Sequence, residues 1–186
     1  MKKIVVLASG EGSNFSAIVE SGITVDMLIT DNKNANVIKR AKKADVPVFV
    51  FDRKEGDYKN GHGWSDGKID ETIPEDVSLI VLAGYMRIIP PVYIKKKKWQ
   101  NKIINIHPSL LPAFGGGCHA IEDAWKHGCK VFGATVHWVD EGVDTGPIIA
   151  QRAIHKFDED TLELITGRIR RVEHYLYPTI IKDIIK

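Results

Sequence analysis

The sequence predicts an α/β fold built on an open, mostly parallel, twisted sheet with helices on both faces. Apolar, β-branched runs at residues 1–8, 23–30 and 79–83 have the composition and length of buried strands. Between the first two runs, apolar residues such as Phe15 and Ile18 recur at the spacing of a helix. Strands that alternate with helices pair in parallel through right-handed crossovers, and this alternation is the main argument for the fold.

The first half of the chain is expected to repeat a strand-and-helix unit. The strand at 1–8 ends in the turn Ser9-Gly-Glu-Gly-Ser-Asn14, and a helix is expected from there to Gly22. The next expected elements are a strand over 23–30, a helix over 35–44, a strand over 47–51 and a buried strand over 79–83. Residues 52–74 contain Gly56, Gly61, Gly63 and Gly67, which weaken a helix, so no element is predicted there.

The second half is expected to continue the alternation and to end in a long amphipathic helix. Its expected elements are a short basic helix over 92–98, a strand over 102–106, a loop over 110–117, a helix over 120–127, strands over 133–139 and 148–154, and a helix from Thr161 to about Tyr177. The polar segment Asp140 to Pro147 joins the last two strands.

Length and charge limit the classes of protein that this chain can be. The 186 residues suffice for about one domain, and the formal charge of +2 lacks the basic excess of a non-specific nucleic-acid binder. The first apolar run, Ile4 to Ala8, is too short for a signal peptide or a membrane span, so a cytoplasmic protein is expected. Cys118 and Cys129 belong to no C-x-x-C pair and are expected to be free thiols.

The turn from Ser9 to Asn14 is the first candidate site. Glycines allow tight backbone geometry, and the N–H groups at the start of the next helix favour an anion such as a phosphate. Only Gly10 and Gly12 are present, so the spacing differs from that of dinucleotide folds, and the lysine of a P-loop is missing. An ordinary glycine-rich turn is the alternative at this point.

Asn105 and His107 form the second candidate site, at the carboxyl end of the strand expected over 102–106. Side chains two residues apart emerge on one face of a strand, and ligands of open α/β sheets bind beyond that strand end. A histidine can hold or move a proton near neutral pH, and an asparagine amide can donate to an oxyanion. The alternative is a histidine that hydrogen-bonds the backbone at a strand end.

The loop from Asp140 to Pro147 is the third candidate. An aspartate such as Asp144 beside His107 would favour the charged imidazole ring and orient it. A glycine-containing acidic loop without such a partner is a solvated turn.

Other kinds of site are disfavoured. His107, His119 and His137 lack the spacing of zinc ligands, so no metal is expected. Lys95 to Lys98 is short and isolated, which favours a solvated helix face over a nucleic-acid patch. The segment from Gly84 to Ile89 follows a buried strand, where exposed backbone could line a flat apolar pocket.

Three parts of the chain together resemble one family. They are Ser9-Gly-Glu-Gly-Ser-Asn14, Leu82-Ala-Gly-Tyr-Met-Arg-Ile88 with Ile103-Ile-Asn-Ile-His-Pro-Ser-Leu-Leu-Pro112, and Gly133-Ala-Thr-Val-His137 with Val139-Asp-Glu-Gly-Val-Asp-Thr-Gly-Pro147. In this order and over nearly the whole chain, they resemble the folate-dependent phosphoribosylglycinamide formyltransferases of purine biosynthesis. The resemblance implies a Rossmann-like formyltransferase fold in one domain over 1–186, with a ribonucleotide-binding half at about 1–100 and a folate-binding, catalytic half at about 101–186.

The resemblance also implies a role for each matching residue. The ribonucleotide would be bound by Gly12, Ser13 and Asn14 at its phosphate and by Glu173 near its glycinamide end. The folate pocket would contain Met86, Arg87, Ile88, Ile89, Asn105, Asp140 and Glu141, with Lys59 near the position where the family has a folate-contacting arginine. Asn105 would bind the formyl oxygen, His107 would act as the acid that stabilises the oxyanion, and Asp144 would orient His107 and raise its pKa.

The implied reaction transfers the formyl group of 10-formyltetrahydrofolate, a cosubstrate, to the primary amine of glycinamide ribonucleotide. The amine attacks the formyl carbon directly, so the resemblance implies neither a covalent enzyme intermediate nor a metal. The expected partners are these two small molecules, with no nucleic acid and no membrane, for a cytoplasmic monomer or homodimer.

Related enzymes and one different class of protein are the alternatives. Methionyl-tRNA formyltransferases share the segment from Asn105 to Pro112, but they are longer and lack the turn from Ser9 to Asn14. A formyltetrahydrofolate deformylase would share Asn105, His107 and Asp144 and normally has an additional N-terminal domain. A non-catalytic folate- or nucleotide-binding protein would have to keep an intact site without turnover.

Overall fold

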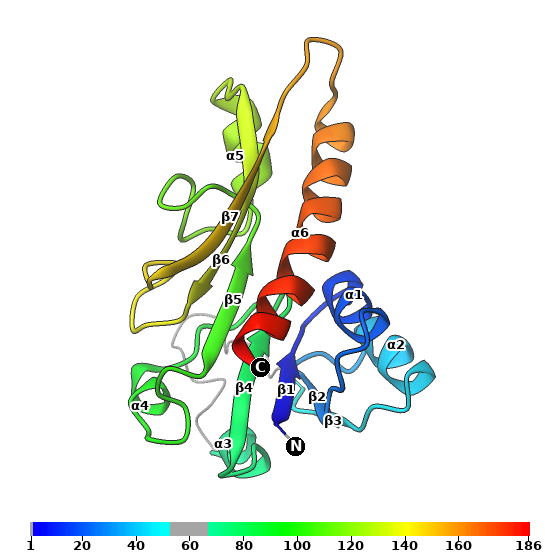
Figure 1. The fold of residues 1–186 in the computed structure, drawn as a ribbon, viewed down its shortest axis with the longest axis vertical. Coiled ribbons are helices and arrows are strands. Elements are labelled where there is room, and N and C mark those ends of the chain that lie inside the picture. Colours follow the sequence, from blue (N-terminus) through cyan, green and yellow to red (C-terminus); the bar gives the residue numbers. More distant parts are fainter. Residues whose placement is uncertain (1, 53–66) are drawn as a thin grey trace. The chain divides into compact units, whose positions relative to one another are not determined.

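The computed structural model describes residues 2–52 and 67–186 and has the α/β architecture expected from the sequence. In this described part, seven strands form a sheet in the order β3-β2-β1-β4-β5-β6-β7 (Figure 1). The chain separates into two compact units, one of residues 1–104 with Ile185 and one of residues 105–184 with Lys186. Each unit has buried apolar residues of its own.

In its described residues, 2–52 and 67–104, the first unit contains four parallel strands, each followed by a helix. The strands are β1 (Lys3–Leu7), β2 (Met27–Thr30), β3 (Val48–Val50) and β4 (Val77–Leu82). The helices are α1 (Ser13–Glu20), α2 (Val37–Lys43), α3 (Lys68–Thr72) and α4 (Pro91–Ile94). Val6 of β1 lies opposite Leu28 of β2 and Val81 of β4. The apolar run from Ile4 to Leu7 is buried throughout, as in a parallel strand that is covered on both faces.

A buried carboxylate of the first unit holds the lysine-rich segment that follows α4. Asp70 of α3 accepts hydrogen bonds from the Trp99 indole N–H at 2.7 Å and from the Lys96 ammonium at 2.5 Å. The Lys98 ammonium lies 3.2 Å from the same carboxylate, and its side chain is only 8% exposed. Three residues close together in the sequence are thus fixed by one residue of a distant helix.

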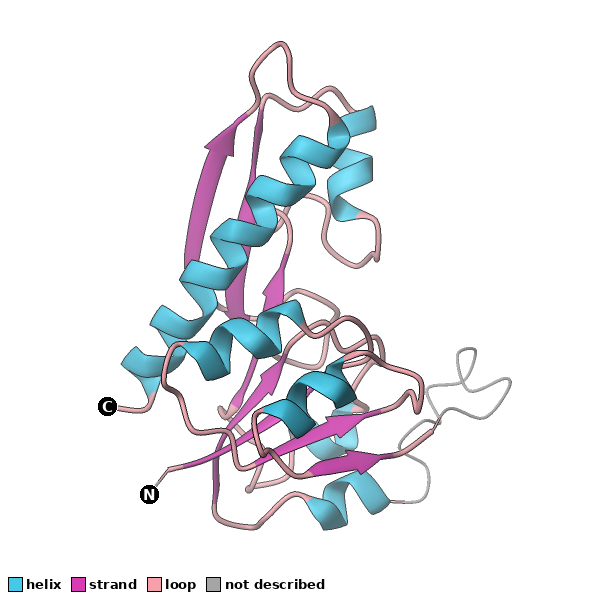
Figure 2. Ribbon diagram, turned by 90° about the vertical axis from the view of Figure 1, so that its right-hand side faces the viewer, coloured by secondary structure: helices cyan, strands magenta, loops and turns pink. Residues whose placement is uncertain are grey.

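The second unit contains the end of β5 (Ile103–His107), an antiparallel strand pair and two helices. The pair consists of β6 (Val131–Trp138) and β7 (Ile148–His155), and the helices are α5 (Ala120–Lys126) and α6 (Leu162–Ile184). α6 runs along the β6–β7 pair (Figure 2). Ile165 and Ile169 of α6 form a buried cluster with Phe132 of β6 and Ala124 of α5.

Three elements differ from the expectation based on the sequence. The first is α3, which forms within the segment over 52–74 where no element was expected, because Gly67 takes a φ of +68° directly before the helix and Ile69 is buried. α6 continues through Pro178 to Ile184, because Tyr177, Pro178 and Ile181 are buried and their packing compensates for the amide that proline lacks. The basic helix expected over 92–98 ends at Ile94, because Lys96 and Lys98 bind Asp70. The helical part of the expectation for Lys95 to Lys98 is therefore wrong, and Lys98 is largely buried, whereas Lys95 to Lys97 are exposed to solvent as expected.

We expect Asp70→Asn to lower the free energy of unfolding by about 2 kcal/mol, because buried donors lose a charged acceptor. Burial alone raises the pKa of Asp70, but hydrogen bonds from Lys96, Trp99 and Lys98 outweigh it and hold the pKa below 3.8. The stabilisation is therefore complete above pH 3.8 and is lost as the pH falls through the lower folded pKa. Urea denaturation over a pH series measures both effects, and the variant should lack this acid-dependent loss.

Asp76→Asn is the matched control for this prediction. Asp76 pairs with Lys3 at 2.8 Å, but both side chains of this pair are exposed. Its removal should change stability little, since exposed ion pairs are screened by solvent. An equal loss of stability in the two variants would contradict the role of burial at Asp70.

Candidate active site

The carboxyl end of β5 presents the two polar side chains that the sequence singles out. Asn105 and His107 alternate with Ile104 and Ile106, which are buried. Both polar side chains therefore leave the strand on the same face. His107 is the last residue of the strand and is itself buried.

The loop between β6 and β7 is closed by its own first aspartate. The Asp140 carboxylate accepts hydrogen bonds from the Gly142 amide at 3.0 Å and from the Thr145 hydroxyl at 2.7 Å. The Trp138 amide donates to the Pro147 carbonyl at 2.9 Å and joins the two ends of the loop. These bonds give the loop one compact shape, which sets the position of every residue in it.

Asp144 lies in this loop in a backbone conformation that few residues adopt. Its φ of +55° is in the left-handed region, which aspartate tolerates better than most side chains do. At Gly146, two residues later, an added Cβ atom would lie 1.9 Å from the Trp138 carbonyl oxygen. The loop can therefore return to β7 only with glycine at that position.

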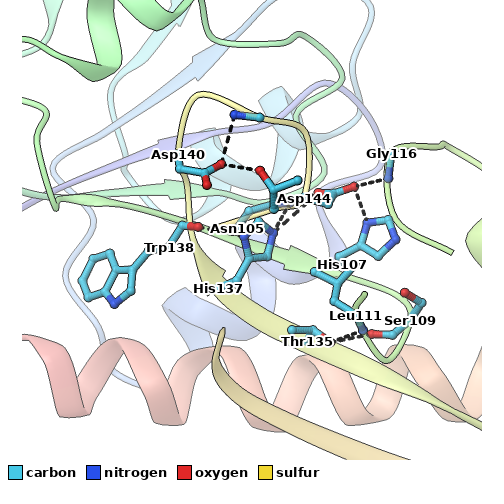
Figure 3. Close-up of polar contacts among 12 residues, drawn as sticks. Asn105, His107, Ser109, Leu111, Gly116, Thr135, His137, Trp138, Asp140 and Asp144 are labelled. Carbon is cyan, nitrogen blue, oxygen red and sulfur yellow. Dashed lines mark hydrogen bonds and ion pairs between the residues drawn. The ribbon is translucent and has the colours of Figure 1, made fainter. Parts of the chain in front are cut away.

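The Asp144 carboxylate brings the candidate residues together (Figure 3). Its Oδ2 atom lies 3.2 Å from Nδ1 of His107 and accepts a hydrogen bond from the Gly116 amide at 2.9 Å. Its Oδ1 atom accepts a hydrogen bond from the Asn105 amide at 3.4 Å. The structure thus places Asn105, His107 and Asp144, the three residues expected to be catalytic, in one cluster.

The surroundings of Asp144 keep it ionised. Burial alone raises the pKa of its carboxyl group. The hydrogen bond from His137, the Gly116 amide and the positive charge of His107 act in the opposite direction and hold the pKa below 3.8. A carboxylate with a lowered pKa stabilises the fold above that pH, and this contribution is lost as the pH falls through the folded pKa.

The second ring nitrogen of His107 faces a backbone acceptor. Its Nε2 atom lies 2.9 Å from the carbonyl oxygen of Phe114, in the loop that follows β5. Nδ1 faces Asp144, so acceptors lie at both ring nitrogens. Only the imidazolium form has an N–H for each of these contacts. The geometry therefore suits a charged His107 paired with a charged Asp144.

His137 of β6 belongs to the same cluster, although sequence reasoning considers it only as a metal ligand. Its side chain is 2% exposed, and its Nε2 atom lies 3.5 Å from Oδ1 of Asp144 and 3.3 Å from the Asn105 amide nitrogen. Its Nδ1 atom lies 2.8 Å from the Trp138 carbonyl oxygen. A proton on Nε2 lets this nitrogen donate to Asp144, in agreement with the lowered pKa of that carboxyl group. The sequence feature that could have indicated its role is its position near the end of an expected strand, directly before the loop that contains Asp144.

A buried hydroxyl secures the segment that follows His107. Thr135 of β6 is fully buried, donates to the Ser109 carbonyl at 2.6 Å and accepts from the Leu111 amide at 3.0 Å. The Gln151 amide of β7 donates to the Thr135 hydroxyl at 3.0 Å and to the Leu111 carbonyl at 2.9 Å. The backbone after His107 is thus held by both antiparallel strands.

A cavity of about 360 Å³ opens beside Asp144 within the second unit. Its walls include Leu111 and Pro112 from the segment after β5, and Val143 and Ile148 from the loop and strand that surround Asp144. A mainly apolar lining with one carboxylate suits a flat organic group that carries a few polar atoms.

The first unit contains the turn expected to bind phosphate. Gly12 has a φ of +74°, and α1 begins at Ser13 and continues through Asn14. The first amides of a helix have no acceptor within that helix, so they are available to an anion. An added Cβ atom on Gly12 would lie 2.5 Å from Cγ2 of Val37, so glycine is required at this position as well.

The segment from residue 86 to residue 89 adjoins this turn in the same unit. The Met86 amide donates to the Ser9 hydroxyl at 2.9 Å. Nε of Arg87 lies 3.1 Å from the carboxylate of the buried Asp31. Met86 and Ile88 are 49% and 62% exposed, whereas Ile89 is buried. The segment therefore offers apolar side chains to a ligand while Arg87 and Ile89 anchor it.

The remaining expected site residues are spread over other elements. Glu173 is half-buried on α6, Glu141 is exposed in the loop of Asp144, and Lys59 lies outside the described residues. Among residues 2–52 and 67–186, no group of three or more His, Cys, Asp or Glu side chains is arranged to hold a metal ion. The helices of that same part are all too short or too polar to cross a membrane.

A comparison with known proteins identifies the family that shares these features. The formyl transferase family model matches residues 2–181. The chain belongs to the formyl transferase family. The match spans both compact units, so it includes the turn before α1 as well as the cluster around Asp144.

Curated relatives and solved structures of similar length agree with this family. A phosphoribosylglycinamide formyltransferase of Bacillus subtilis is 46% identical to this formyl transferase over 191 residues, which cover 100% of this chain and 95% of the relative. One from Haemophilus influenzae is 38% identical and covers 98% and 86% of the two chains. The phosphoribosylglycinamide formyltransferase structure from Streptococcus pneumoniae matches all of both chains, with a TM-score of 0.89 and 38% identity. These likenesses confirm the predicted α/β fold.

We expect Thr135→Val to lower the free energy of unfolding by about 2 kcal/mol, because the Ser109 carbonyl and the Leu111 amide lose a buried partner. Valine has nearly the same shape as threonine, so the substitution removes hydrogen bonds and changes volume little. Urea denaturation measures the loss. The kcat of formyl transfer should fall as well, because the segment after His107 loses its attachment to β6.

Thr179→Val provides the comparison for this substitution. The Thr179 hydroxyl donates to the Tyr175 carbonyl at 2.8 Å on the exposed side of α6. Its removal should change the free energy of unfolding by no more than about 0.5 kcal/mol, as is usual at the surface. If Thr135→Val were equally mild, the buried bonds of Thr135 would not support the site.

Proposed function

We propose that this formyl transferase moves the formyl group of 10-formyltetrahydrofolate to the primary amine of glycinamide ribonucleotide. The observation that carries the proposal is the cluster in which Asp144 lies 3.2 Å from His107 and 3.4 Å from Asn105. The relatives from Bacillus subtilis and Haemophilus influenzae are named for phosphoribosylglycinamide, which supports this amine as the acceptor.

The proposed reaction requires stabilisation of an oxyanion. The amine nitrogen forms a bond to the formyl carbon, and the carbonyl electron pair moves onto oxygen. The intermediate collapses when the bond from that carbon to N10 of the folate breaks, and the proton lost by the amine passes to N10. A donor aimed at the developing oxyanion lowers the barrier by about 3 kcal/mol in comparable sites.

His107 and Asn105 are the proposed donors to this oxyanion. His107 donates from Nε2, and Asn105 donates from its amide nitrogen. Asp144 orients the imidazolium through Nδ1 and balances its charge, as the aspartate of a catalytic triad does. For His107, the reaction exchanges a hydrogen bond to the neutral Phe114 carbonyl for a stronger, charge-assisted bond to the oxyanion.

The proposed binding residues divide according to the two substrates. The phosphate of the ribonucleotide meets the amides at Gly12, Ser13 and Asn14, and Glu173 serves the glycinamide end. The folate contacts are assigned to Met86, Arg87, Ile88, Ile89, Asn105, Asp140 and Glu141, and to Lys59 by resemblance alone. The exposed Met86 and Ile88 support this assignment, because a pterin ring needs apolar surface on its faces.

The setting of the reaction is part of the same proposal. 10-Formyltetrahydrofolate is consumed as a cosubstrate, and no metal takes part. The protein acts in the cytoplasm as a monomer or homodimer. The single domain with a ribonucleotide half at about 1–100 and a folate and catalytic half at about 101–186 remains a prediction.

We expect the purified protein to consume 10-formyltetrahydrofolate only when glycinamide ribonucleotide is present, as followed by the absorbance of the folate. His107→Ala should lower kcat by about 10²- to 10³-fold and leave both KM values nearly unchanged, because the lost donor acts mainly in the transition state. Asp144→Asn should also lower kcat strongly, since the His107 ring then lacks its charged partner.

His155→Ala is the matched control, because His155 is an exposed histidine at the end of β7 and takes no part in the proposed site. It should retain full activity. Consumption of the formyl donor at the same rate without the ribonucleotide would identify a deformylase instead. Binding of both substrates without turnover would identify a non-catalytic binding protein.

A further inference from the structure

Helix α2 holds the turn between β1 and α1 from one side. The Val37 amide donates to the Gly10 carbonyl at 3.1 Å, and Nε of Arg40 donates to the Glu11 carbonyl at 2.6 Å. Nη1 of Arg40 also donates to the hydroxyl of Ser16 in α1 at 3.1 Å. Two successive carbonyls of the turn are therefore fixed by one helix, and Arg40 connects that helix to α1 as well.

These contacts determine where the amides on the other side of the turn point. In a planar trans peptide, the N–H points away from the carbonyl of the preceding residue. Fixing the carbonyls of Gly10 and Glu11 therefore directs the amides of Glu11 and Gly12 away from α2. Within the described residues, these two amides have no acceptor in the protein. Successive amides presented in this way form a concave site that suits an anion.

Close packing leaves the turn little freedom to change this arrangement. Gly12 has a φ of +74°, and its Cα faces Val37 so closely that an added Cβ atom would lie 2.5 Å from Cγ2 of that side chain. α2 thus touches the turn at residues 10, 11 and 12 in succession. Of the two hydrogen bonds from α2 to the turn carbonyls, only that of Arg40 comes from a side chain, so it can be removed without changing the backbone.

We propose that Arg40 is a positioning residue for the phosphate of the amine substrate, because it holds the peptide between Glu11 and Gly12 so that its N–H meets that phosphate. The inference rests on the proposed function, which supplies the phosphate. The guanidinium of Arg40 is exposed, and solution ions screen exposed charges. Its hydrogen bonds to the turn, and not its distant charge, are therefore the main source of the effect.

Arg40→Met removes both donors and keeps an apolar stem of similar length. We expect the KM for glycinamide ribonucleotide to rise about tenfold, the loss expected for one charge-assisted hydrogen bond. The kcat and the KM for 10-formyltetrahydrofolate should change by less than about twofold, because the phosphate contributes binding and not chemistry. The dissociation constant of ribose 5-phosphate, measured by calorimetry without turnover, should also rise about tenfold.

Two further variants separate this role from general effects of the substitution. Lys39→Met removes an exposed cation from the same helix and should change the dissociation constant by less than about twofold. Ser16→Ala removes one hydrogen-bond partner of the Arg40 guanidinium with little risk to folding. This variant should raise the dissociation constant of ribose 5-phosphate about twofold. The difference between wild type and Arg40→Met should persist at high salt, because hydrogen bonds are screened less than distant charges.

Several results would overturn the proposal. One is an unchanged dissociation constant of ribose 5-phosphate in Arg40→Met. Another is an equal rise of the KM values for glycinamide ribonucleotide and 10-formyltetrahydrofolate in this variant. The third is that wild type and Arg40→Met bind ribose 5-phosphate equally well at high salt. A wild type that binds ribose 5-phosphate but transfers no formyl group would refute the proposed function and leave the role of Arg40 intact. A wild type that transfers the formyl group, with ribose 5-phosphate bound equally well by Arg40→Met, would refute only the role of Arg40.

Discussion

The Asp144 carboxylate is shared by groups from several segments of the second unit. Asn105 and His107 reach it from β5, the Gly116 amide from the following loop, and His137 from β6. The position of the carboxylate depends in turn on a loop that hydrogen bonds and tight glycine packing keep in one shape. The orientation of the imidazole ring and of the asparagine amide is therefore a consequence of how that loop is built, and neither side chain sets its own direction.

The two proposed sites solve the same physical problem in a similar way. Each places reactive or ligand-binding groups at, or directly after, the carboxyl end of a strand, where the regular hydrogen bonds of the sheet end. In each case a side chain from a neighbouring element replaces those bonds. Thr135 does so for the backbone after His107, and Arg40 does so for the turn after β1. Polar side chains outside the proposed sites thus determine the backbone geometry of the segments that form those sites.

Local patterns were sufficient to predict most of the elements, and together with a family resemblance they singled out the three residues that the structure brings together around Asp144. The buried run of β1 and the alternation of Asn105 and His107 with isoleucines are visible in a few consecutive residues, and a family resemblance pointed to Asp144. Other features depend on partners far along the chain. The burial of Lys98 requires Asp70, and the continuation of α6 through Pro178 requires a packed surface under the helix. The hydrogen bond between His107 and the Phe114 carbonyl involves a backbone atom, which leaves no trace in residue identity.

The same dependence explains why His137 is recognised only in the structure. Its significance arises from its distance to Asn105, which lies on a different strand. No spacing rule connects residues 105 and 137, because the interval between them contains a loop, a helix and most of a strand. Sequence reasoning that tests histidines against metal-ligand patterns therefore passes over a histidine that binds an amide and a carboxylate.

The tight fit at Gly146 limits how this protein can diverge. A side chain there would meet the Trp138 carbonyl oxygen at 1.9 Å, and one at Gly142 would meet the Thr145 hydroxyl at 2.0 Å. A side chain at Gly146 would therefore displace backbone, and one at Gly142 would displace the Thr145 side chain, so both changes disturb the loop itself. Glu141 and Val143 are exposed and meet no such barrier. Changes in what this loop recognises are accordingly easiest to accommodate at residues 141 and 143, because substitutions there leave the frame around Asp144 in place.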